Sequence, residues 1–160
     1  MTDDMLVALA RNGGVAQVNF YCGFISQKWV DRSKELKAAK DPDYEKVQAL
    51  FMSEHTPQSM QQLYEAEAVL EKKLPRPPLS DLIDHIDHMV KIAGVDHVGI
   101  GSDFDGINMC PRQLEDVSCY PYITQELLNR GHSRAAIHKI LGGNVLRVMR
   151  DADAVAKAWK

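Results

Sequence analysis

The fold of this chain is decided at residues 97–106, which read His97-Val98-Gly99-Ile100-Gly101-Ser102-Asp103-Phe104-Asp105-Gly106. Residues 97–101 form a short apolar run that is typical of a buried parallel strand. Asp103 closely follows that run, at the carboxyl end, where parallel α/β barrels place their active sites. A carboxylate there can bind a metal, hold a water or accept its proton, although it can also simply cap a turn. Asp103 is therefore the strongest candidate for a chemical role.

A second strand and several helices surround this segment. Residues 15–20 are β-branched and mostly apolar, which predicts another buried strand. Helices are expected before each strand, the first capped by Thr2 and the next by Ser80, and three more should follow residue 120. Strands that alternate with helices indicate parallel βαβ units. Two strands cannot close a barrel, so the sequence predicts an α/β chain that is part of a larger domain.

Residues 26–78 differ from the rest and are interpreted as an insertion between a strand and its returning helix. Residues 26–74 are charged and helix-prone, and Pro42 and Pro57 stand where new helices can begin. A proline-rich connector, residues 75–78, follows. We therefore expect residues 1–160 to form a single partial domain that contains a helical insertion and its connector. The insertion could cap the mouth of a barrel or form an interface.

Composition excludes several classes of function. The 160 residues carry a formal net charge of only −3, and their basic residues are scattered, so no nucleic-acid footprint or polybasic membrane patch is present. No apolar run reaches the roughly 20 residues that span a bilayer. Three cysteines without CxxC spacing favour unpaired thiols. These thiols, together with an acidic N-terminal segment unlike a leader, slightly favour the cytoplasm, but they leave the compartment open.

A histidine-rich helix segment at residues 84–88 could suggest a metal site. His85 and His88 stand three residues apart on one helical face, with Asp87 between them. A metal held there would need a third ligand from another element. We therefore favour a structural role, with i, i+4 pairing of Asp81 to His85 and of Asp84 to His88.

The remaining polar candidates have simple structural interpretations. His55, His132 and His138 lie in helical or capping contexts and are expected on solvated faces. Asn144 follows the Gly142-Gly143 pair, which is expected to separate the last two helices, and Asn144 should cap the final one. Arg147 should hold a neighbouring carboxylate or a loop carbonyl.

Five blocks of sequence resemble one known family. Residues 96–106 are similar to the last-strand signature of the membrane (renal) dipeptidases, and residues 12–21 are similar to the strand before it. Residues 84–94 resemble the family's penultimate helix, whereas residues 114–117 and 143–148 match its closing segments. The insertion is the least matched part. The resemblance implies the C-terminal part of a (β/α)8 TIM-type barrel in a zinc metallopeptidase of the amidohydrolase-like type.

The resemblance also implies a reaction. In that family a hydroxide that bridges two zinc ions attacks the peptide carbonyl of a dipeptide, and dipeptides with a C-terminal D-residue are accepted. Asp103 would meet the substrate amine and shuttle a proton to the leaving nitrogen, without being a metal ligand. Tyr21 and Phe24 would line the same mouth as substrate-binding residues, or they could serve only to pack the barrel rim.

The family's zinc ligands are missing from these residues. They comprise a His-x-Asp pair, a bridging Glu and two later histidines, all on earlier strands, and the resemblance places them before Met1. This chain is therefore expected to bind no zinc and to be inactive alone. Two alternatives remain open: a truncated chain that acts as a binding or assembly partner, and another metal-dependent amidohydrolase. The expected partner is a dipeptide, and a homodimer is left open because relatives are often dimers.

Overall fold

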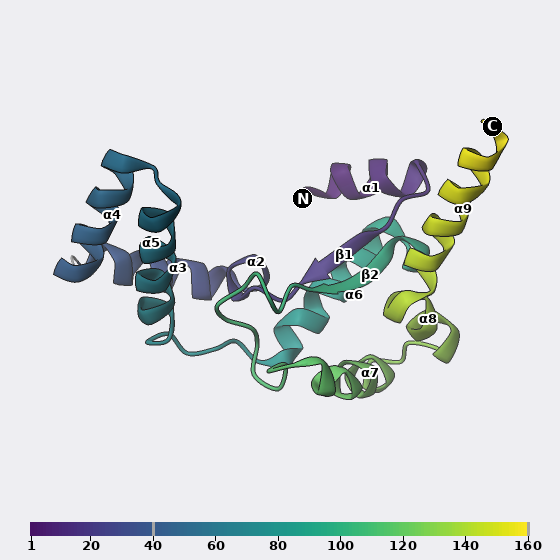
Figure 1. Ribbon diagram of the computed structural model, residues 1–160. Coiled ribbons are helices and arrows are strands. Elements are labelled where there is room, and N and C mark those ends of the chain that lie inside the picture. The colour runs from purple at the N-terminus through teal and green to yellow at the C-terminus, as the bar shows by residue number, and fades with distance from the viewer. Residues whose placement is uncertain (40, 160) are drawn as a thin grey trace.

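The computed structural model describes residues 1–39 and 41–159 and shows a mostly helical α/β chain (Figure 1). The strands are β1 (Ala16–Asn19) and β2 (Val98–Ser102). The helices are α1 (Asp3–Arg11), α2 (Cys22–Ile25), α3 (Gln27–Ala38), α4 (Pro42–Glu54), α5 (Pro57–Glu71), α6 (Leu79–Ala93), α7 (Tyr120–Asn129), α8 (Arg134–His138) and α9 (Asn144–Ala158). Three short turns are also helical: η1 (Val95–His97), η2 (Val117–Cys119) and η3 (Lys139–Gly143). Both predicted strands are confirmed to within a residue or two, whereas α2 was not expected.

β1 and β2 pair in parallel, as the alternation of strands and helices predicted. Val18 lies opposite Ile100, but Asn19 lies opposite Ser102, so Gly101 is the extra residue of an irregularity at the carboxyl end of β2. A Cβ atom on Gly101 would lie 3.3 Å from a backbone oxygen of β1, so glycine permits this close approach. Such irregularities re-aim the residues that follow them.

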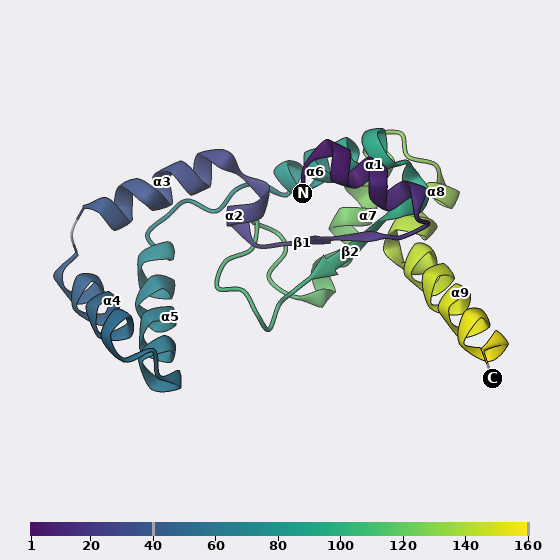
Figure 2. The same cartoon turned by 90° about the horizontal axis from the view of Figure 1, so that it is seen from above.

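The hydrophobic core lies between the two strands and α6. The apolar positions of α6 recur with the helical period, and Leu82, Ile83 and Ile86 have no exposed surface. Full burial of each such side chain contributes about 1.5–3 kcal/mol. α1 and α7 also contact α6, and Figures 1 and 2 show α6 running beside the strands. The returning helix therefore holds the sheet.

Side-chain caps begin the helices α1, α4, α5 and α8. Thr2, Asp41, Thr56 and Ser133 each accept a hydrogen bond from a backbone N–H of the first turn. The expectation for Ser80 was wrong. α6 begins at Leu79 after Pro78, because proline fixes a backbone angle compatible with a helix start, and this start has no side-chain cap.

The helices α3, α4 and α5, together called the arm, extend away from the sheet (Figures 1 and 2). α4 and α5 pack against each other along the arm. At its base, Cys22, Trp29 and Leu74 form a second, smaller buried cluster. The connector is also fixed, because Arg76 Nε donates to the carbonyl of Cys110 at 2.7 Å. The arm is therefore joined both to α2 and to the loop that follows β2.

The end of the chain corrects one prediction and confirms another. Asn144 does not cap α9, because η3 runs directly into the helix and Asn144 itself has helical backbone angles. Its Nδ2 instead donates to the carbonyls of Val95 and Val98, at 2.7 and 2.8 Å. Arg147 does hold loop carbonyls, including that of Gly13 at 2.8 Å. Both side chains therefore tie α9 to the segment around β2.

None of the helices within residues 1–39 and 41–159 combines the length and apolar character needed to cross a bilayer. The three cysteines are free thiols, as their spacing predicted.

Replacing Asn144 by Ala should lower the free energy of unfolding by about 2–4 kcal/mol, because two hydrogen bonds are lost and two carbonyls are left unpaired. The measurement is urea unfolding followed by circular dichroism. Asn129→Ala is the matched control, since Asn129 is exposed at the end of α7 and its loss should cost no more than about 0.5 kcal/mol. Equal losses in the two variants would contradict a special role for Asn144.

Candidate functional site

The backbone turns sharply where β2 ends. Ser102 and Asp103 have positive φ angles of 37° and 74°, in the region that L-residues rarely adopt. This conformation costs about 1–2 kcal/mol for each residue with a Cβ, and aspartate tolerates it better than most. Strained backbone of this kind gathers at functional sites. The chain therefore leaves the extended conformation of the strand at these two residues.

The Asp103 carboxylate is bonded to the end of the neighbouring strand. Asn19 Nδ2 donates to Asp103 Oδ2 at 2.7 Å, and Asn19 Oδ1 accepts from the backbone N–H of Tyr21, also at 2.7 Å. The other carboxylate oxygen lies against Gly106, where a Cβ atom would clash with it. The Asp-x-x-Gly spacing therefore makes room for the carboxylate, while Asn19 fixes its orientation.

A pocket of about 230 Å³ opens beside this carboxylate. Its walls come from three segments of the chain: the start of α2, the helix α5 and the loop after β2. The lining residues are Tyr21, Phe24, Tyr64, Glu67, Glu71, Asp103, Gly106, Ile107 and Asn108. The three residues singled out in the sequence, Asp103, Tyr21 and Phe24, thus lie around one pocket. Their roles in binding or catalysis stay predictions.

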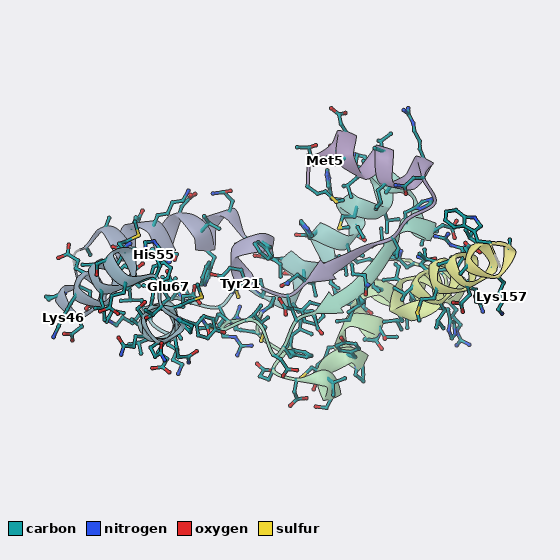
Figure 3. All side chains as sticks on the ribbon, turned by 45° about the horizontal axis from the view of Figure 1, so that its top comes forward. Met5, Tyr21, Lys46, His55, Glu67 and Lys157 are labelled. Carbon is teal, nitrogen blue, oxygen red and sulfur yellow. The ribbon has the colours of Figure 1, made fainter. Side chains whose placement is uncertain are left out.

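Tyr21 connects the pocket to the arm. Its hydroxyl donates to Glu71 Oε1 at 2.6 Å, and its ring meets those of Phe24 and Trp29 edge-on, at centroid distances of 5.2 and 5.5 Å. Burial, and then the neighbouring Glu71 carboxylate, raise the pKa of the Tyr21 phenol far above its ordinary value. Tyr21 therefore stays protonated and serves as a hydrogen-bond donor. Figure 3 labels Tyr21 where the arm meets the rest of the chain.

Two glutamates of α5 complete the acidic side of the pocket. Glu71 is only 3% exposed, and its Oε2 has no hydrogen-bond partner among the described residues. Glu67, also labelled in Figure 3, accepts hydrogen bonds from Lys37 Nζ at 2.8 Å and from the Tyr44 hydroxyl at 3.2 Å. The two carboxylates therefore differ, because Glu67 has a positive partner and Glu71 has only a neutral one.

Sequence reasoning missed two of these residues. Asn19 could have been found, because it is a polar residue that closes an apolar strand next to the first pocket residue, Tyr21. Glu71 gave no signal, since it is one of many charged residues in the amphipathic helices of the insertion. Only the packing of α5 shows that it is buried.

The histidine-rich segment of α6 does not gather around one point. Asp87 accepts from Arg130 at 2.8 Å and contacts His132 Nε2 at 2.7 Å, while His88 Nε2 contacts Asp3 at 2.8 Å. The structural interpretation stands, although with other partners than the expected i, i+4 pairs. His132 is also not on a solvated face, since its side chain is 15% exposed. Long-range packing of α7 and α1 on α6 supplied these partners.

The donors present do not make a zinc site by themselves. Within residues 1–39 and 41–159, no group of three or more His, Cys, Asp or Glu side chains is placed to hold a metal ion. The carboxylates at the pocket are already engaged, Asp103 by the Asn19 amide and Glu71 by the Tyr21 phenol. Structural and catalytic zinc sites need at least three protein ligands.

The acidic pocket lies at the carboxyl ends of two parallel strands. In α/β proteins, this edge of the sheet is where ligands bind. Comparison with known proteins places the chain within that class. A family model described as membrane dipeptidase (peptidase family M19) matches residues 1–160. The chain therefore belongs to the membrane dipeptidase family, as the resemblance of its five sequence blocks implied.

Individual relatives agree with the family. A dipeptidase of Schizosaccharomyces pombe is 34% identical over 155 residues, which cover 96% of this chain and 27% of the relative. Dipeptidase aclJ of Aspergillus oryzae is 50% identical over 80 residues, covering 50% of this chain and 19% of its own length. The chain thus spans about a quarter or less of these curated relatives.

Solved structures show the same fold. The probable dipeptidase PvdM from Pseudomonas aeruginosa superposes with a TM-score of 0.68 at 29% identity, over 92% of this chain and 39% of that protein. A metallo peptidase from Rhodobacter sphaeroides, liganded with a phosphinate mimic of the dipeptide L-Ala-D-Ala, superposes with a TM-score of 0.58 over 90% of this chain and 29% of its own. At 19% identity, that second similarity concerns the fold alone.

Cys22, at the start of α2 beneath the pocket, gives a pH-dependent prediction. Burial above all raises the pKa of its thiol from 9.0 to about 12. As the pH rises, the thiol ionises in the unfolded chain before it ionises in the folded chain. The contribution of the protonated thiol to the free energy of unfolding is therefore complete below pH 9 and is lost as the pH rises toward 12. Urea midpoints measured from pH 6 to pH 11 should therefore fall less steeply above pH 9 in Cys22→Ala than in the wild type. Parallel curves across the whole range would contradict the assignment.

Proposed function

We propose that this chain provides part of the active site of a metal-dependent dipeptidase, with a (β/α)8 barrel completed by residues outside these 160. Family membership supports the reaction class, and the parallel strands support the barrel. Within the part of the chain that the structure describes, β1 and β2 pair only with each other. Each strand therefore keeps one open edge to which further parallel strands can be added.

Asp103 is the residue of this chain to which we assign the chemistry. The observation that carries the assignment is a carboxylate on a strained turn at a strand end, oriented by Asn19 and set on the pocket wall. A carboxylate held in this way can accept a proton from the attacking nucleophile and pass it to the leaving amine. It can also bind the positively charged amine of the substrate. Tyr21 and Phe24 would line the pocket around the dipeptide.

Zinc is assigned to the same site, with its ligands supplied from outside these 160 residues, because the donors among residues 1–39 and 41–159 do not fit a metal centre. Zinc lowers the pKa of water to about 7 and so provides a nucleophile at neutral pH. The contribution of this chain is then to orient the substrate and to handle the proton at Asp103.

A non-catalytic binding or assembly role is the second candidate. The absence of a metal-binding group among the described residues favours it over hydrolysis by this chain alone. Under either candidate, the 160-residue chain by itself should bind no zinc and release no amino acids from L-Ala-D-Ala, so this measurement does not separate them. Only the first requires that the protein encoded by the whole gene hydrolyse this dipeptide.

Asp103→Asn in the protein as its gene encodes it should reduce kcat for L-Ala-D-Ala by at least about 100-fold, because proton transfer by a positioned carboxylate is lost. Zinc content, measured by mass spectrometry, should be unchanged. Asp105→Asn is the matched control, as Asp105 is an exposed carboxylate two residues away. It should keep most of the activity.

Each result has a clear meaning. Loss of zinc together with activity in Asp103→Asn would show that Asp103 is a metal ligand. A wild-type protein with bound zinc but no hydrolysis of any dipeptide would overturn the proposed function and favour the non-catalytic candidate.

A further inference from the structure

The pocket beside Asp103 contains more carboxylates than the single one that proton transfer requires. Three carboxylates line it, those of Glu67, Glu71 and Asp103, and the described residues contribute no Lys, Arg or His side chain to its wall. Glu67 forms an ion pair with Lys37 at 2.8 Å. Among the described residues, neither of the other two carboxylates forms an ion pair. The pocket therefore has an unbalanced negative charge.

Glu71 shows an unmet bonding requirement in this pocket. One carboxylate oxygen accepts from the Tyr21 hydroxyl at 2.6 Å, while the other, Oε2, is buried and unpartnered. A buried acceptor without a donor carries a desolvation cost that a ligand donor can relieve. Burial and the Glu71 carboxylate both favour the protonated form of Tyr21, so that phenol adds no charge and continues to donate to Oε1. The position left open at Glu71 is therefore suited to a positively charged donor.

The rest of the lining favours an organic cation. Tyr21, Phe24 and Tyr64 contribute aromatic rings to the pocket, and such rings attract ammonium groups through their π faces. A bound metal ion suits the pocket less well, because the described residues include no group of three metal donors. Carboxylates combined with aromatic rings recognise an alkylammonium group by both charge and apolar contact.

We propose that Glu71, carried by the inserted helix α5, is a specificity-determining residue that makes this pocket take a cationic side chain of the dipeptide, such as that of lysine. The inference rests on the proposed function, in which Asp103 binds the substrate's own amine and leaves Glu71 for a second positive charge. The insertion then acts as a selector for substrate charge. Its attachment to the site is the Tyr21–Glu71 hydrogen bond.

The test compares substrates that differ only in charge, using the protein as its gene encodes it. L-Lys-D-Ala is compared with L-norleucyl-D-Ala, and L-Ala-D-Lys with L-Ala-D-norleucine. At one of the two positions, kcat/KM should be about 10-fold higher for the lysine substrate, a size typical of one hydrogen bond between charged groups. Glu71→Gln should raise KM for the lysine substrate, so that the ratio of kcat/KM for lysine over norleucine substrates falls from about 10 to about one.

Glu65→Gln is the matched control on the same helix. Glu65 is exposed and contacts Gln61 at 2.8 Å, outside the pocket lining, so the lysine preference should persist in this variant. A binding measurement covers the case in which Glu71→Gln does not fold. Titration of the wild type with n-butylammonium, followed by NMR, should shift resonances of the pocket residues, whereas n-butanol at equal concentration should leave them unchanged.

The outcomes separate the two proposals. Equal rates for lysine and norleucine substrates, or a preference that survives in Glu71→Gln, would overturn the charge-selecting role and leave the dipeptidase function in place. Binding of butylammonium without hydrolysis of any of the four dipeptides would overturn the dipeptidase function and keep the cation site. Equal responses to butylammonium and butanol would also overturn the cation site.

Discussion

The parallel pairing of β1 with β2 is the constraint on which the other features depend. Two parallel neighbours must start at the same end, so the chain between them has to travel back along the sheet. α6 makes that return and buries its apolar face against the strands. The arm is extra length within the same crossover, and it branches off at the carboxyl end of β1. The pairing also brings the two carboxyl ends together, which is why Asn19 can hold Asp103 and why the pocket forms at that edge.

Polar side chains donate hydrogen bonds to backbone carbonyls in the segments next to the sheet. The Asn144 amide donates to two carbonyls around β2, and the Arg76 guanidinium donates to a carbonyl of the loop after it. Irregular backbone has no ladder to satisfy its carbonyls, so side-chain donors must do so when that backbone is covered. The Asn144 bonds lie at the amino end of β2, whereas the strained turn lies at its carboxyl end. There the Asp103 carboxylate accepts from the Asn19 amide, which links the turn to the end of β1.

The bond between Tyr21 and Glu71 joins the arm to the site. The sequence left open whether this segment caps the mouth of a barrel or forms an interface. The wall of the pocket includes residues from α5, whose sequence lies outside the blocks that resemble the family. In the proposed charge-selecting role, Glu71 of α5 adds a substrate preference to the strand-end chemistry of Asp103. Tyr21 belongs to both parts, since it follows the strand-end Asn19 and donates to the arm.

The sequence by itself determined the local elements and the family. Apolar runs placed both strands, the helical period placed α6, and the residues after β2 pointed to Asp103, whose catalytic role stays a prediction. These features depend on neighbours a few residues apart, so a single sequence contains them. Only the tertiary structure decided that Asn144 clamps carbonyls instead of capping a helix, and that Glu71 lies buried at the pocket. Those contacts join residues 46 to 50 positions apart, and no local pattern records which side chain a folded chain will bring there.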